Sequence, residues 1–141
     1  MADDKGERED EVNRLFYLQS LYNQQYEALM SELTTMSMAE GALERNLGLL
    51  NKKDMVKGAN ILVSGEGGTY FEANVKDIKK VMTYVGAGYL VEKEAAQAKE
   101  FIEKSIEQSK AAIAKLLDEK QKLETEIMRI QYTIDAMQQE R

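Results

Sequence analysis

Apolar residues recur every three or four positions through the first third of the chain. Only Gln19 and Glu40 interrupt the series, which alternates spacings of three and four. Its members are Val12, Leu15, Gln19, Tyr22, Tyr26, Leu29, Leu33, Met36, Glu40, Leu43, Leu47 and Leu50. This is the heptad pattern of a coiled coil, and these are its a and d positions. The pattern predicts a long helix over residues 11–53, preceded by an acidic tail over residues 1–10.

The last third of the chain repeats the pattern, with Ser109 and Lys120 as the polar exceptions. The series is Ile102, Ile106, Ser109, Ile113, Leu116, Lys120, Leu123, Ile127, Ile130, Ile134 and Met137. It predicts a second long helix over residues 94–139. Because a narrow apolar stripe on one helix stays exposed to water, we expect the two helices to form an antiparallel coiled-coil hairpin. One register pairs Glu40 with Ser109, and a register shifted by one heptad pairs it with Leu116.

Residues 60–93, between the two predicted helices, follow a different pattern. Short runs rich in β-branched and aromatic residues occupy 61–64, 69–75, 80–85 and 89–93, with glycines or polar residues between them. Such runs predict four strands paired as two β-hairpins, joined by residues 75–80. The fold class is therefore α+β, in a single domain of 141 residues.

Two glycine-rich stretches raise the alternative of a phosphate-binding loop. The "GAG" at 86–88 resembles the start of a dinucleotide fingerprint, but Val91 stands where the third glycine belongs and a strand follows instead of a helix. The "GEGG" at 65–68 lacks the Lys-Ser/Thr pair of a P-loop, and Glu66 would repel phosphate. We interpret both stretches as turns and expect no cofactor.

The predicted strands carry more large apolar side chains than two isolated hairpins can cover. These candidate assembly residues are Ile61, Leu62, Val63, Tyr70, Phe71, Val81, Val85, Leu90 and Val91. Isolated hairpins are marginally stable in water, and strands from several chains can close a barrel that leaves no free edge. We therefore expect the β insert to oligomerise into a β-barrel platform.

Apolar residues outside the heptad core gather at the end of the coiled coil remote from the insert. Phe16, Tyr17, Leu18 and Leu21 lie there on the first helix, and Met128 and Tyr132 on the second. Exposed apolar patches usually mark binding surfaces. The candidate binding residues at this free end are Leu15, Phe16, Leu18, Leu21, Tyr22, Ile130, Tyr132, Ile134 and Met137. For Leu15, Tyr22, Ile130, Ile134 and Met137, packing between the helix ends is the favoured alternative, because they occupy a or d positions.

The amino-acid composition of the chain excludes several classes of function. The chain has no Cys and no His, which excludes thiol and imidazole catalysis, a Cys/His zinc site and disulfides. Its net charge is -6 and its basic residues are scattered, so we expect no nucleic-acid partner. Apolar runs are too short to span a membrane, and the polar, acidic start is unlike a signal peptide. We expect a cytoplasmic protein that is not an enzyme and holds no metal.

The insert, flanked by heptad helices, closely resembles the α-type subunit of prefoldin, a hexameric chaperone. The resemblance is sharpest over "ILVSGEGGTYFEANVKDIKKVMTYVGAGYLVEK", residues 61–93, and extends over the whole chain in architecture. Two hairpins instead of one is the feature that separates α-type from β-type subunits in that family. The chain departs from the family's usual prolines at Ser64 and Ala95.

The resemblance implies partners and a mechanism. It implies a hetero-hexamer of two α-type and four β-type subunits, whose hairpins form a double β-barrel from which six coiled coils project. Unfolded client proteins would be held at the coiled-coil tips without ATP and delivered to a group II chaperonin. The acidic residues 1–10 would be solvated, or would contact basic chaperonin surface. The alternative function is a coiled-coil scaffold or adaptor whose tips bind one dedicated protein partner.

Overall fold

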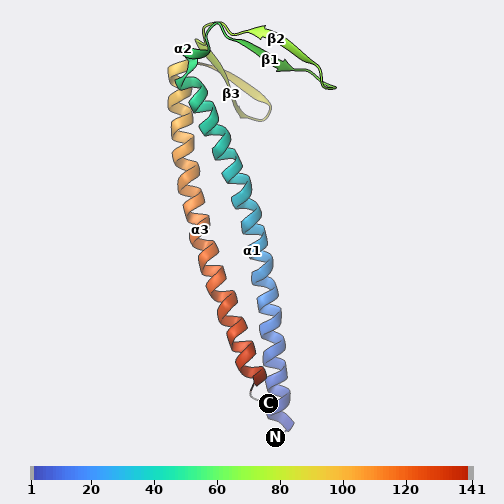
Figure 1. Cartoon of the computed structure of the whole chain (residues 1–141). Coiled ribbons are helices and arrows are strands. Elements are labelled where there is room, and N and C mark those ends of the chain that lie inside the picture. The colour runs from blue at the N-terminus through green and yellow to red at the C-terminus, as the bar shows by residue number, and fades with distance from the viewer. Residues whose placement is uncertain (1, 140–141) are drawn as a thin grey trace. The chain divides into compact units, whose positions relative to one another are not determined.

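A computed structural model describes residues 2–139 of the protein (Figure 1). In chain order its elements are α1 (Ala2–Asn51), α2 (Lys53–Val56), β1 (Asn60–Ser64), β2 (Tyr70–Asn74), β3 (Lys80–Gly86), β4 (Tyr89–Glu94) and α3 (Ala95–Gln139). Two long helices with two antiparallel hairpins between them confirm the expected coiled-coil hairpin with a β insert.

The chain divides into two compact units by its internal contacts. The outer unit contains the chain up to Met38 and the chain from Lys110 onward, and the inner unit contains residues 39–109. Each long helix therefore contributes one segment to each unit. That the chain acts as a single domain stays a prediction.

The outer unit is a two-helix coiled coil in which α1 and α3 lie side by side and antiparallel (Figure 1). Leu15, Ile130 and Ile134 form its buried cluster, and Val12 and Met137 pack against that cluster. Gln19 Nε2 donates a hydrogen bond of 2.7 Å to Gln131 Oε1 across the helices. A shift by one heptad would separate these partners by about two turns, so the contacts favour the register that pairs Glu40 with Ser109.

Helix α1 begins earlier and ends earlier than the heptad pattern predicts. It starts at Ala2, so the described part of the acidic segment is helical and is no separate tail, and it ends at Asn51. Hydrophobic periodicity could not detect this start, because no apolar stripe precedes Val12. Acidic side chains near a helix N-terminus are stabilised by the helix dipole, and Glu11 pairs with Arg14 one turn later. Helix formation therefore extends past the apolar pattern.

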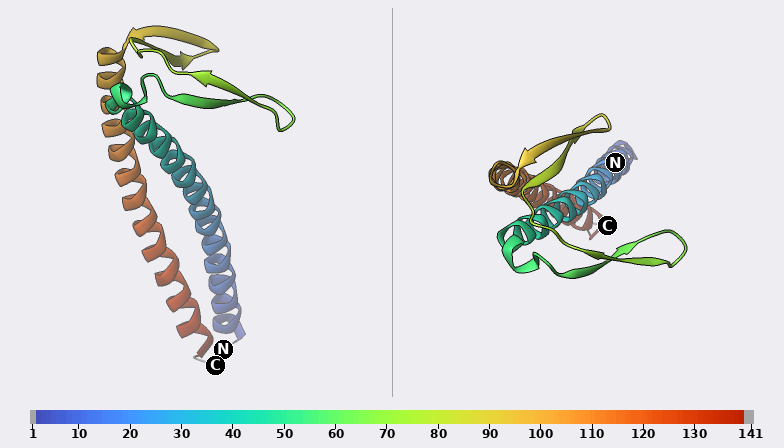
Figure 2. Two further views of the ribbon diagram at one scale, coloured as in Figure 1. Left: turned by 45° about the horizontal axis from the view of Figure 1, so that its top comes forward. Right: turned by 90° about the horizontal axis from the view of Figure 1, so that it is seen from above.

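The inner unit holds two separate two-stranded sheets, β1–β2 and β3–β4 (Figure 2). The turn between β3 and β4 has positive φ angles at both central residues, 52° at Ala87 and 80° at Gly88. That combination defines a type I′ turn, whose twist suits a tight hairpin. The glycine-rich "GAG" thus forms the hairpin turn that the sequence predicts.

Strand β4 passes directly into α3 without a connecting loop. Glu94, expected as the first residue of the second helix, ends β4, and α3 starts at Ala95. The side-chain ammonium of Lys93 lies 3.6 Å from the centroid of the Phe101 ring, a cation–π contact between strand and helix. Ala98 is completely buried at this junction. The Lys93–Phe101 contact thus connects strand β4 to helix α3.

Candidate functional site

The candidate binding residues at the free end of the coiled coil separate into buried and exposed sets. Leu15, Ile130 and Ile134 are buried, and Ile134 is only 1% exposed. They are core residues and are inaccessible to a ligand, so their assignment to a binding surface is corrected. The heptad positions of these residues already favoured this outcome.

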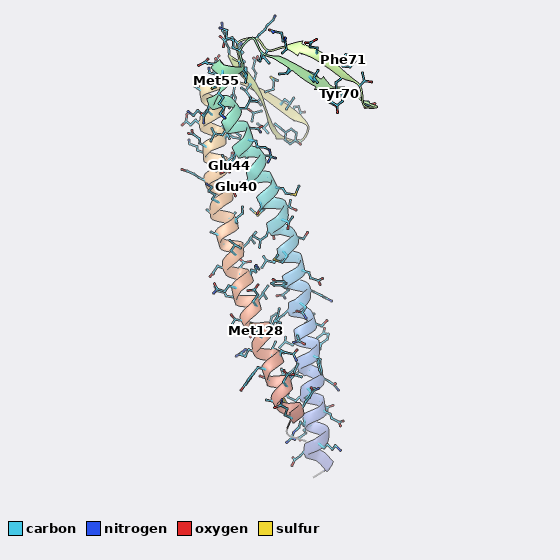
Figure 3. All side chains as sticks on the ribbon, in the orientation of Figure 1. Glu40, Glu44, Met55, Tyr70, Phe71 and Met128 are labelled. Atoms are coloured by element: carbon cyan, nitrogen blue, oxygen red, sulfur yellow. The ribbon has the colours of Figure 1, made fainter. Side chains whose placement is uncertain are left out.

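The remaining candidates are partly or fully accessible. Leu18, Tyr22 and Met137 are partly buried against the core cluster. Phe16 is 43% exposed, and Tyr132 is 78% exposed. We call the exposed apolar side chains of this end the tip surface; they are Phe16, Tyr17, Leu21, Met128 and Tyr132. Figure 3 shows Met128 on α3.

A cavity of about 700 Å³ opens beside Phe16. Its apolar part is formed by Val12, Phe16 and Met137. Its polar part comes from Asp4, Lys5, Arg8, Glu9, Asn13 and Gln138. Sequence reasoning missed this cavity, because it depends on the first turns of α1 continuing beside the last turn of α3.

One ion pair on α1 has a resolved effect on protonation. Arg14 Nη2 lies 2.6 Å from Glu11 Oε1, and both side chains are exposed. The hydrogen bond from Arg14, and then its positive charge, lower the pKa of the Glu11 carboxyl below its ordinary value. The same contact raises the pKa of the Arg14 guanidinium. Both groups are therefore charged at neutral pH.

The hairpin β1–β2 has one apolar face and one mixed face. Its register places Val63 opposite Phe71 and Ile61 opposite Ala73. Side chains alternate between the faces of a strand, so these four residues share one face. Leu62 and Tyr70 lie on the other face, with Glu72. Figure 3 labels Tyr70 and Phe71, which are neighbours on β2 and are both exposed. We call Ile61, Val63, Phe71 and Ala73 the apolar hairpin face.

The hairpin β3–β4 also exposes apolar side chains. Of its predicted assembly residues, Val85, Leu90 and Val91 are exposed, and Val81 is half-buried. The structure adds Met82, Tyr84 and Tyr89, which the sequence analysis did not select and which are all exposed. For Met82 and Tyr84 the signal was present in the alternation of strand 80–86, where every second residue points to the same side.

Residues 2–139 contain neither a metal-binding cluster nor a membrane-spanning helix. No group of three or more acidic, His or Cys side chains in this part of the chain is placed to hold a metal ion. Among the described helices, none has a stretch apolar and long enough to cross a bilayer.

A coiled coil and β-hairpins that leave apolar surfaces uncovered define a protein that associates with other polypeptides. The family model described as "Prefoldin subunit" matches residues 22–140. The chain therefore belongs to the prefoldin family, whose members are chaperones and not enzymes, and it is a prefoldin chaperone subunit. No catalytic family is indicated.

Curated relatives agree with the resemblance to α-type subunits. The chain is 28% identical over 137 residues to prefoldin subunit alpha of Methanosarcina mazei, with 89% of this chain and 96% of the relative covered. It is 26% identical over 132 residues to prefoldin subunit alpha of Archaeoglobus fulgidus, covering 93% and 96% respectively. The expected resemblance to an α-type prefoldin subunit is confirmed.

A solved structure extends the comparison to three dimensions. The chain is similar to a subunit in the cryo-EM structure of filamentous prefoldin from Methanocaldococcus jannaschii, with a TM-score of 0.55 and 25% sequence identity. The match covers 94% of this chain and 99% of that chain. The family and this match support an oligomeric prefoldin assembly.

Proposed function

We propose that the protein is the α-type subunit of an ATP-independent holdase that binds non-native polypeptides and delivers them to a group II chaperonin. One observation carries the proposal: large apolar side chains are exposed in two separate regions, the tip surface and the two hairpins. Monomeric proteins rarely leave so much apolar surface in contact with water. Each region therefore needs its own partner.

The hairpins are the proposed assembly surface. Every strand has one unpaired edge, since each sheet contains only two strands. Strands of neighbouring subunits would pair with these edges and cover the apolar hairpin face, closing a barrel. The partners are β-type prefoldin subunits in a hetero-hexamer of two α-type and four β-type chains. The complex would work in the cytoplasm.

The tip surface is the proposed client site. Aromatic and methionine side chains adapt to many partner shapes, which suits a surface that must accept unrelated unfolded chains. Phe16, Leu21 and Tyr132 project outside the buried cluster, so their removal leaves the heptad core intact. They can therefore be tested without unfolding the coiled coil.

The test is a triple variant, Phe16→Ser with Leu21→Ser and Tyr132→Ser, assembled with a β-type subunit. We expect normal native mass and loss of protection for a urea-unfolded test protein diluted from denaturant. Met55→Ser is the control, because Met55 is exposed but lies on α2. Undiminished protection by the triple variant would contradict the tip assignment. Protection of only one among several unrelated clients would favour the dedicated scaffold instead.

A further inference from the structure

The two hairpins of the inner unit differ in how far the rest of the chain covers them. All five residues of β1 are exposed, and Ala73 is the half-buried residue of β2. In β3 burial alternates instead, because Val81 and Thr83 are half-buried and their neighbours on either side are exposed. Lys93 of β4 is half-buried too, and the register places it opposite Val81. The hairpin β3–β4 therefore has an inner face, formed by Val81, Thr83 and Lys93, and an exposed outer face.

Both strands of β3–β4 are attached to the first turn of α3. Strand β4 continues into the helix without a loop, and the Ala95 N–H donates a hydrogen bond of 3.0 Å to the Lys79 carbonyl, directly before β3. Ala95 and Ala98 are buried at this junction, as is Ile102 one turn further along α3. The position of the base of the hairpin is thus fixed, and its remaining freedom is a tilt toward the helices or away from them.

Close packing does not fix this tilt, because the hairpin and the helices border a cavity. The cavity measures about 570 Å³ and is lined by residues of α1, β3, β4 and α3, including Val81 of the inner face. The Lys93 ammonium nevertheless reaches α3, where it lies 3.6 Å from the centroid of the Phe101 ring. Phe101 follows Ala95 by six residues, or about 9 Å along a helix that rises ~1.5 Å per residue. The contact therefore lies away from the junction, where it can restrict the tilt.

The strength of the Lys93–Phe101 contact follows from its surroundings. Phe101 is 38% exposed and Lys93 is half-buried, so water competes only in part for the ammonium. The apolar stem of the lysine covers the inner face while its charge lies over the ring. A cation–π contact at a partly exposed site changes the ratio of two conformations by about two- to fivefold. The contact is thus strong enough to favour one orientation of the hairpin.

The backbone hydrogen bonds at the base of β1–β2 connect that hairpin to itself. The Gly58 N–H donates a hydrogen bond of 2.7 Å to the Val75 carbonyl, and the Val75 N–H donates one of 2.9 Å to the Ala59 carbonyl. These bonds extend the ladder between β1 and β2 and do not set the tilt of the hairpin relative to the helices. We therefore expect β1–β2 to take a fixed orientation only when a partner covers the apolar hairpin face.

We propose that Lys93 and Phe101 are positioning residues, which hold hairpin β3–β4 in one orientation before assembly so that it makes the first contact with a neighbouring subunit. This role rests on the proposed assembly through the hairpins and adds an order to it. A surface that is already oriented loses less conformational freedom on binding, and it associates faster than one that must first rearrange. Hairpin β1–β2 is oriented and covered in the second step.

The kinetics of association with a β-type subunit test the positioning role. Phe101→Leu keeps an apolar side chain but removes the ring, whereas Phe101→Trp keeps a ring for the ammonium. We expect Phe101→Leu to lower the association rate constant about threefold, with the dissociation rate constant and the final native mass unchanged. Phe101→Trp should associate as fast as the parent chain. Lys93→Met removes only the charge and should match Phe101→Leu, and the two changes together should be no slower than either alone.

Ile61→Ala on the apolar hairpin face is the matched control. It removes a contact formed after the first encounter, so it should raise the dissociation rate constant and leave the association rate constant unchanged. Equal association rates for Phe101→Leu and Phe101→Trp would overturn the positioning role, and so would slower association of Ile61→Ala. Assembly through the hairpins would still stand if Val63→Asp with Phe71→Asp abolished the oligomer. Normal assembly of that double variant would overturn both proposals.

Electron paramagnetic resonance on the full chain before assembly measures the orientation of each hairpin directly. The chain has no Cys, so introduced cysteines carry spin labels at the chosen positions alone. Tyr89→Cys with Lys104→Cys measures the distance from the β3–β4 turn to α3, and Glu66→Cys with Lys104→Cys measures that from the β1–β2 turn. We expect a narrow distance distribution for the first pair, broadened by Lys93→Met, and a broad distribution for the second. Equally broad distributions for the two pairs in the parent chain would contradict the proposed order.

Discussion

The tip of the coiled coil and the β-hairpins both expose large apolar side chains, but their surroundings differ. At the tip, Leu15 and Ile134 are buried by contacts within the chain, and the exposed residues surround that core. In the hairpins no residue of the four strands is buried, and both faces of β1–β2 are accessible. The tip has a core of its own, and the hairpins do not.

This difference indicates two kinds of association. A region whose core is complete can release its ligand and stay folded, which suits transient binding of clients. A two-stranded hairpin without a buried face is marginally stable by itself, which suits permanent association. Removing the partner should therefore affect the hairpins more than the tip, and four predictions test this contrast.

The largest effect is expected on the apolar hairpin face. Val63→Asp with Phe71→Asp would place two charges where a neighbouring subunit covers the hairpin, and burying unpaired charges is strongly unfavourable. We expect complete loss of the oligomer by native mass spectrometry, with helical circular dichroism retained. Leu62 and Tyr70 are also candidate assembly residues but lie on the mixed face, so Leu62→Asp with Tyr70→Asp should weaken the oligomer less. If the two pairs behave alike, the assignment of faces is wrong.

The next effect separates core from surface at the tip. Ile134→Ala empties a fully buried position and should lower the free energy of unfolding by about 2–4 kcal/mol. Tyr132→Ala, two residues away and 78% exposed, should change it by less than about 0.5 kcal/mol. Urea denaturation of the assembled complex, followed by circular dichroism, measures both. Similar losses for the two variants would show that Tyr132 is part of the core.

In the second hairpin, β3–β4, we expect a smaller effect that raises the free energy of unfolding instead of lowering it. Ala87 has a φ angle of 52°, a region that costs a non-glycine residue about 1–2 kcal/mol. Ala87→Gly should therefore raise stability by up to about 1 kcal/mol, because the greater entropy of the unfolded chain with glycine offsets part of the relieved strain. Ala114→Gly in α3 is the matched control and should lower stability by about 1 kcal/mol. A lowered melting temperature for Ala87→Gly would contradict the type I′ turn.

The smallest effect concerns pH at the start of α1. The folded-state pKa of Glu11 is lowered by Arg14, so the pair contributes stability above the unfolded pKa of glutamate and loses it as pH falls through the folded value. Because both groups are exposed, we expect only slight fraying of the first turns in acid, seen as chemical-shift changes by NMR. In the Glu11→Gln variant, the acid-dependent change in chemical shift at Arg14 should be absent. An unchanged titration at Arg14 would argue against the pair.

Several elements followed directly from local sequence. The two heptad series predicted both helices, and the glycines at 86 and 88 predicted the hairpin turn, because these signals depend on neighbouring residues along the chain. The early start of α1 was missed, since its first ten residues have no apolar periodicity to detect. Met82 and Tyr84 were passed over although strand alternation pointed to them.

The candidate site was only partly predictable for a different reason. Heptad positions distinguished Leu15 and Ile134, which are buried, from Phe16 and Tyr132, which are exposed, because a residue's position in the heptad largely sets its burial in a coiled coil. The cavity beside Phe16 could not be predicted in the same way. It requires the first turns of α1 to lie beside the last turn of α3, and two registers were compatible with the sequence.

By itself, the sequence determined the two long helices, the four strands, their order, the hairpin turn at 86–88 and the family resemblance, because each is encoded in short-range patterns of residue type. Tertiary structure decided the rest. Only the pairing of α1 with α3 places Phe16 beside Met137 and Met30 beside Leu117, and only the strand register places Val63 and Phe71 on one face. The physical reason is that a binding surface is made by residues distant in sequence, whose juxtaposition depends on which layers of the core pack together.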